Sequence, residues 1–74
     1  MPDEKITDLA AMELPFRRKA KLRLVEFESG MKMVRLVLRE GTRITQVDLD
    51  KESASQLAQA LLDGAKSASD DVGQ

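Results

Sequence analysis

The stretch that decides the fold is VRLVLREGTRITQVDLD, residues 34–50. In its first half, Val34, Leu36 and Leu38 lie on one face of a predicted strand. The residues between and after them, Arg35, Val37 and Arg39, lie on the other face. Glu40 and Gly41 predict a tight hairpin turn, because glycine adopts positive φ without steric cost. The Thr, Ile and Val content after the turn is typical of a second strand. We therefore expect an antiparallel hairpin with strands over 31–40 and 42–49.

A further strand is predicted before this hairpin, over residues 17–28, with a turn at Ser29-Gly30. The alternation in this strand changes parity between Leu24 and Val25. Either both faces of the strand are partly covered there, or a bulge shifts its register.

A helix is predicted after the last strand, with Asp50 as its N-cap and its end at about Leu62 or Ala65. Its apolar residues recur at helical spacing and form one stripe. They are Ala54, Leu57, Ala58, Leu61, Leu62 and Ala65.

The sequence thus predicts an α+β fold, an antiparallel β-meander followed by one C-terminal amphipathic helix. The meander has three strands, or four if the N-terminal arm adds one. Residues 1–14 are expected to be that arm, partly disordered or a short helix, because their apolar positions are scattered. Residues 15–66 form the single domain, and 67–74 are expected to be a disordered acidic tail.

Length and composition limit which oligomeric state and which cellular location we expect. A chain of 74 residues allows one domain, which is marginally stable alone. It has no cysteine and therefore no disulfide to support it, so we expect a homodimer that adds buried surface. The N-terminus has neither a basic region nor a long apolar run, so we expect no signal peptide, no membrane partner and a cytoplasmic protein.

The residue types in this chain do not favour a catalytic function. The chain lacks both histidine and cysteine, which are the commonest general base and the commonest zinc ligands. The carboxylates of Asp48 and Asp50 are explained more simply as a turn and a helix cap than as an acid/base or metal pair. We therefore expect no enzyme, no catalytic residue, no metal and no cofactor.

Charge is strongly segregated along a chain whose net charge is only −1. Residues 17–43 hold nine cations against three acids, whereas the flanks 1–16 and 44–74 are net acidic. Such a basic segment is either ordinary surface charge that protects strand edges or a path for phosphates. The candidate nucleic-acid-binding residues are Arg17, Arg18, Lys19, Lys21, Arg23, Arg35, Arg39 and Arg43.

The order of elements adds a resemblance. Basic strands followed by REGTRITQVDLDKESASQLAQALL, which leads from the last strand into one helix, resemble the single-stranded-DNA-binding domain of the transcriptional coactivator positive cofactor four. The resemblance covers roughly residues 17–65. It implies a dimer formed through the helices, with concave sheet faces that hold DNA or RNA. The chain is also similar to short uncharacterised bacterial proteins.

Two functions are therefore expected from the sequence. The first is a small dimeric binding module that holds single-stranded DNA or RNA on a basic sheet face. The alternative is a protein-interaction or structural module, in which Met33 and Val37 meet a protein partner and the arginines form a polar rim.

Overall fold

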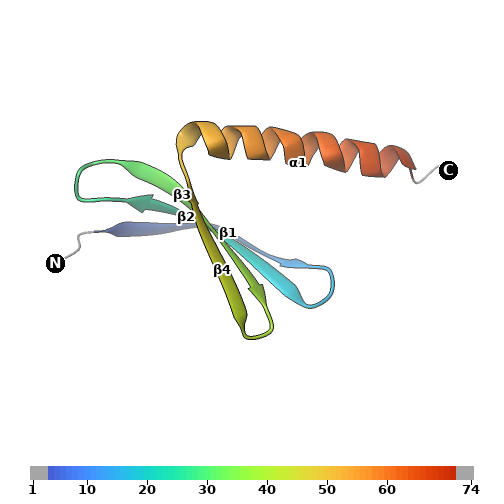
Figure 1. Ribbon diagram of the computed structural model, residues 1–74, viewed down its shortest axis with the longest axis horizontal. Coiled ribbons are helices and arrows are strands. Elements are labelled where there is room, and N and C mark those ends of the chain that lie inside the picture. Colours follow the sequence, from blue (N-terminus) through green and yellow to red (C-terminus); the bar gives the residue numbers. More distant parts are fainter. Residues whose placement is uncertain (1–3, 72–74) are drawn as a thin grey trace.

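The structure of the protein is a computed structural model that describes residues 4–71, with side chains for residues 4–69. It confirms the α+β arrangement, because an antiparallel meander of four strands in the order β1-β2-β3-β4 precedes a single helix (Figure 1). The elements are β1 (Lys5–Leu14), β2 (Arg18–Glu26), β3 (Lys32–Glu40), β4 (Arg43–Leu49) and α1 (Lys51–Asp71).

The N-terminal arm is a strand, so the expectation of a disordered segment or a short helix is wrong for residues 5–14. Strand β1 pairs with β2 from Lys5 opposite Glu26 to Leu14 opposite Arg18. The segment has weak strand propensity of its own, but β2 offers it a free edge and charges of opposite sign. The described part of the arm therefore adds the fourth strand.

A bulge is present, but it lies in β1 and not in β2. The register shifts between Asp8 and Ala10, while β2 pairs with β3 without interruption. Leu24 and Val25 therefore point to opposite sides of the sheet, and Val25 is fully buried. Of the two explanations for the parity change, coverage of both faces is the correct one at this position.

Two of the three hairpin turns use glycine as predicted. Gly30 and Gly41 have φ values of +93° and +62°. The β1–β2 turn is different, because Phe16 and Arg17 adopt φ values of +65° and +62° without being glycine. That conformation costs a non-glycine residue about 1–2 kcal/mol.

The register gives the sheet two chemically different faces, because directly opposed residues point to the same side. The apolar face is the side that carries Met12, Ala20, Leu22, Leu24, Val34, Leu36, Leu38, Val47 and Leu49. The basic face is the opposite side, with Lys19, Lys21, Arg23, Arg35 and Arg39 as its cations. The predicted separation of Val34, Leu36 and Leu38 from the arginines of the same strand is thus confirmed.

Within residues 4–69, only Ala20 and Val25 are buried among the apolar side chains. One face of a sheet is normally covered by a second layer, and among the described residues this cover is only partial. Helix α1 contacts only β3 and β4 among the described strands, and it runs away from the sheet toward the C-terminus (Figure 1).

Helix α1 starts as expected but ends later. Asp50 caps it, since its Oδ1 accepts a hydrogen bond of 2.7 Å from the Ser53 amide. The helix continues to Asp71, past the predicted end, and Gly64 lies inside it. Residues 67–71 are therefore helical and not a disordered tail, while 72–74 lie outside the described residues. Over the part of the chain that the structure describes, no helix is long and apolar enough to cross a membrane.

Candidate nucleic-acid interface

The structure divides the eight predicted contact residues into three groups. Five of them share the basic face, namely Lys19, Lys21, Arg23, Arg35 and Arg39. Arg18 and Arg43 flank Glu40 in one cross-strand row at the end of the opposite, apolar face. Arg17 lies in the β1–β2 turn. The predicted site is thus not one continuous surface, and only the first group forms a face.

A row of four charged residues crosses the whole basic face. Asp8, Arg23, Arg35 and Asp48 oppose one another in β1, β2, β3 and β4. The two arginines occupy the inner strands and the two carboxylates the outer strands. This row therefore neutralises itself, and it ties the edge strands to the centre of the sheet.

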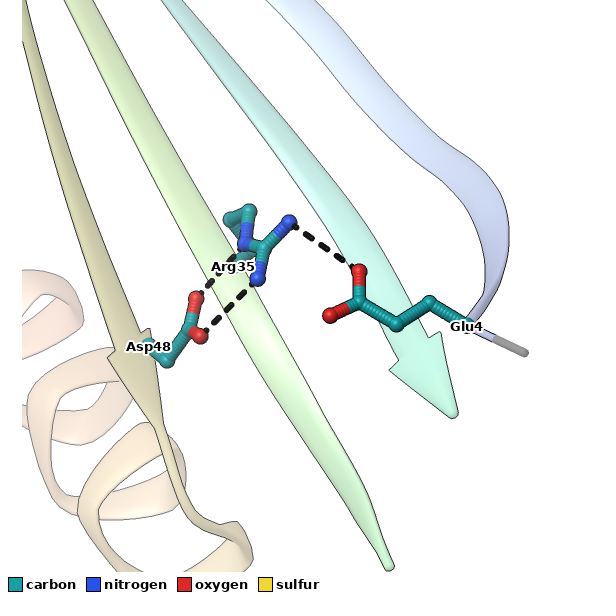
Figure 2. Close-up of polar contacts among 3 residues, drawn as sticks. All are labelled: Glu4, Arg35 and Asp48. Atoms are coloured by element: carbon teal, nitrogen blue, oxygen red, sulfur yellow. Dashed lines mark hydrogen bonds and ion pairs between the residues drawn. The ribbon is translucent and has the colours of Figure 1, made fainter. Parts of the chain in front are cut away.

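Arg35 is the most strongly engaged cation of this row. Its Nε and Nη2 donate hydrogen bonds of 2.7 and 3.0 Å to the two carboxylate oxygens of Asp48. Its Nη1 lies 3.9 Å from Oε1 of Glu4, which approaches from the start of the chain (Figure 2). Only 14% of the side chain is exposed. The fork-shaped contact occupies the donors that a phosphate would need.

The same contact shifts the pKa of both partners. The hydrogen bond to Asp48, with smaller support from charge attraction, raises the pKa of Arg35. The hydrogen bond from Arg35 lowers the pKa of Asp48 below its usual range, and burial opposes this effect only partly. Asp48 is therefore a charged structural partner at neutral pH.

Arg23 is held less firmly. Its Nε lies 3.1 Å from Oδ1 of Asp8, which is close enough for an ion pair. The N–H is not directed at that oxygen, however, and Nε is buried without a hydrogen-bond acceptor. A buried donor without an acceptor is unfavourable, so Arg23 is the member of the row that gains most from a new anionic partner.

The remaining cations of the basic face surround a shallow hollow. Lys19, Lys21 and Arg39 form no ion pair among the side chains of residues 4–69. The hollow has a volume of about 340 Å³, and its lining contains four cations and no carboxylate. The lining residues are Lys19, Lys21, Arg23, Val37, Arg39, Ile44 and Gln46. Unpaired cations around apolar and amide groups can hold a phosphate backbone whose bases rest on the sheet.

Arg18 belongs to a separate cluster at the end of the sheet. Its Nε and Nη2 lie 3.1 and 2.7 Å from the same oxygen of Glu40. Its guanidinium carbon lies 5.9 Å from the centre of the Phe16 ring, which is within cation–π range. Phe16 itself is 84% exposed at the tip of the β1–β2 hairpin.

Sequence reasoning missed the division between paired and unpaired cations. Asp8 and Asp48, which pair with Arg23 and Arg35, are distant from them in sequence, and Asp8 lies in the N-terminal arm, for which a fourth strand was left open. The only available signal was the excess of acids on both sides of the basic segment. Asp50 acts as the expected cap, whereas Asp48 is explained by its ion pair.

The comparisons with known proteins reveal a family relationship over most of the chain. The family model described as "Family of unknown function (DUF6967)" matches residues 3–67. The chain belongs to this family. No curated protein and no solved structure matches it. The DUF6967 family match fits the expectation of a small uncharacterised protein, and the comparisons give no support to the resemblance to positive cofactor four.

Proposed function

We propose that this DUF6967 protein is a small binding module that holds single-stranded nucleic acid on its basic face. The observation that carries the proposal is the hollow around Val37, where four cations converge and no carboxylate intrudes. Arg35 is not among the proposed contacts, because two of its guanidinium nitrogens already donate hydrogen bonds to Asp48. The contacts to phosphate are assigned to Lys19, Lys21, Arg23 and Arg39.

The shape of the sheet favours a single strand over a duplex. The hollow is shallow and lies on the open surface of the β-sheet. An extended nucleic-acid strand can therefore lie along it with its bases against Val37 and Ile44. Duplex grooves are read by an inserted helix or ribbon, which the open face does not provide. The exposed ring of Phe16 lies near Arg18, which belongs to the opposite face, and it is not part of the lining of the hollow, so the stacking surface is assigned to Val37 and Ile44 alone.

The test is fluorescence anisotropy with a labelled single-stranded oligonucleotide and a duplex of the same length. Binding should weaken by about 20-fold between 50 and 200 mM salt if three unpaired cations each neutralise one phosphate. Replacing all three by glutamine (K19Q, K21Q and R39Q) should abolish that binding.

The matched control removes the same charge elsewhere, through K32Q, K51Q and K66Q. These lysines lie off the basic face, so binding should change little. Equal losses in both triple variants would mean that net charge alone attracts the oligonucleotide. No binding of the native chain at low salt would overturn the proposal.

A protein-interaction module is the second candidate. Met33 and Val37, which the sequence suggested as its contact residues, lie on the basic face, and the observation that favours this candidate comes from the opposite side of the sheet. The apolar face is exposed in the single chain, with Met12, Leu38 and Val47 each more than a third accessible. Exposed apolar patches of this kind mark surfaces that meet a protein. In that case changes on the apolar face should remove the partner, while changes around the hollow should not.

A further inference from the structure

Within the described residues, two apolar surfaces of this chain remain largely uncovered. The first is the apolar face, where Met12, Leu38 and Val47 are 50%, 39% and 44% exposed. The second is the helix stripe, defined as Ala54, Leu57, Ala58, Leu61, Leu62 and Ala65. In this stripe Leu61 and Leu62 are 64% and 60% exposed. A sheet face and a helix stripe are the two surfaces that pack together in a two-layer α+β domain.

Within the described chain, helix α1 reaches only β3 and β4 of its own sheet. Only Asp50 separates the end of β4 from the start of α1. Its backbone and side chain both serve the helix N-terminus, since the Ala54 and Ser53 amides donate to them at 2.9 and 2.7 Å. A one-residue connection with a fixed cap sets the direction of the helix, and this direction leads away from the sheet (Figure 1).

The exposed area matches what a stable dimer removes from water. The accessible surface is 6311 Å², whereas a compact monomer of 8.2 kDa exposes about 4,500 Å². The radius of gyration of 15.0 Å also exceeds the value of about 11 Å for a compact domain of this length. The surplus of about 1,800 Å² per chain falls in the range that one subunit of an obligate homodimer buries.

We propose that a second copy of this chain covers the apolar face, with the helix of each copy lying along the sheet of the other. A helix of 21 residues is about 32 Å long, and a strand of nine residues spans about 30 Å, so the two surfaces match in length. One two-fold axis satisfies both copies, because each contributes one sheet face and one helix stripe. The basic faces then point outward on both sides of the dimer.

A cross-linking experiment tests this arrangement directly, because the native chain contains no cysteine. Single variants Leu36→Cys and Leu61→Cys are unfolded together, refolded and treated with a short bismaleimide. We expect a product that joins residue 36 of one chain to residue 61 of the other. The matched pair Val37→Cys and Leu61→Cys should give little of the corresponding product, since Val37 lies on the opposite face. Equal yields, or products joining only 36 to 36 or 61 to 61, would overturn the arrangement.

A second measurement does not depend on cross-linking. Light scattering should give twice the chain mass of 8.2 kDa, and the unfolding midpoint should rise with protein concentration. Leu61→Gln should lower both the dimer fraction and the midpoint, whereas Ala60→Gln, away from the helix stripe, should leave them unchanged. A monomeric native mass, or a Leu61→Gln variant that behaves like the native chain, would overturn the proposal.

Discussion

The same four strands build both faces of this sheet, yet one face is apolar and the other is basic. Leu36 and Val37 are neighbours in β3, but one lies at the centre of the apolar face and the other at the centre of the basic hollow. Within the described residues the apolar face is largely uncovered, whereas the lining of the hollow has four cations and no carboxylate. A period of two in the sequence is thus enough to give one layer of strands two surfaces of different chemistry.

A second contrast lies within the basic face. Arg35 and Arg39 both point to the basic face from strand β3, and the alternation pattern alone offers no reason to distinguish them. Arg35 is enclosed between Asp48 and Glu4, while Arg39 lines the hollow without an acid. The difference teaches that cross-strand neighbours, and not residue type, decide which cation remains available to a ligand.

The largest expected effect comes from a charge placed on one face or the other. Leu36→Lys should abolish the dimer and lower the cooperativity of unfolding, because a lysine would be buried in the interface. Val37→Lys should keep the dimer and should raise affinity for single strands. Sedimentation and thermal unfolding of the two variants side by side check this prediction. Dissociation by both substitutions would show that the faces are not independent.

The second prediction separates Arg35 from Arg39. Arg35→Gln should cost about 1–3 kcal/mol of unfolding free energy, because Asp48 keeps its charge but loses its hydrogen-bond donors. Arg39→Gln should leave stability within about 0.5 kcal/mol of the native value. It should instead make the plot of log binding constant against log salt concentration shallower, by about 0.7 in slope. Urea titration and anisotropy of both variants measure the two effects, and a reversed pattern would refute the assignment.

The third prediction concerns acid. Because Arg35 holds the folded pKa of Asp48 below that of the unfolded chain, the ion pair stabilises the fold fully above about pH 4. This contribution is lost as the pH falls through the folded pKa. Stability of the native chain should therefore decline below about pH 4, and Asp48→Asn should show a shallower decline from a lower starting value. Urea midpoints between pH 2 and 7 provide the measurement; equal slopes would contradict the prediction.

The smallest effect is expected at the β1–β2 turn. Arg17→Gly should raise stability by up to about 1 kcal/mol, because glycine accepts the observed φ of +62° without a steric penalty. The turn lies outside the apolar face, so the dimer should be unaffected. Thermal unfolding at fixed concentration tests this, and a destabilised variant would show that the arginine side chain itself supports the turn.

The sequence predicted the elements whose signals are local. The hairpin over 34–50 follows from alternation and Gly41, and the start of the helix follows from Asp50. The sequence left open whether the N-terminal arm adds a strand, because the pairing of β1 depends on the free edge of β2, which lies outside any short window. The late end of the helix was missed because the apolar stripe ends at Ala65, and the polar residues after it carry no apolar periodicity that would extend the helix.

The candidate site was predicted only as a set of residue types. Five of the eight cations share a face because alternation fixes their side of the sheet. The ion pairs of Arg23 with Asp8 and of Arg35 with Asp48 depend on the register between neighbouring strands. Alternation within a strand does not predict that register. Arg18 and Arg43 were included for their charge, although they lie at the end of the apolar face beside Glu40.

The bulge between Asp8 and Ala10 also limits how large an assembly can grow. A regular, exposed edge strand invites strands from other molecules and can propagate without end, whereas a bulged and charged edge is a poor template. Strand β1 carries this interruption near its middle, and β4 at the other edge has only seven residues. In the dimer that we propose, chains meet through their faces and form a closed pair, and a bulged edge then works against the open-ended pairing that builds fibres.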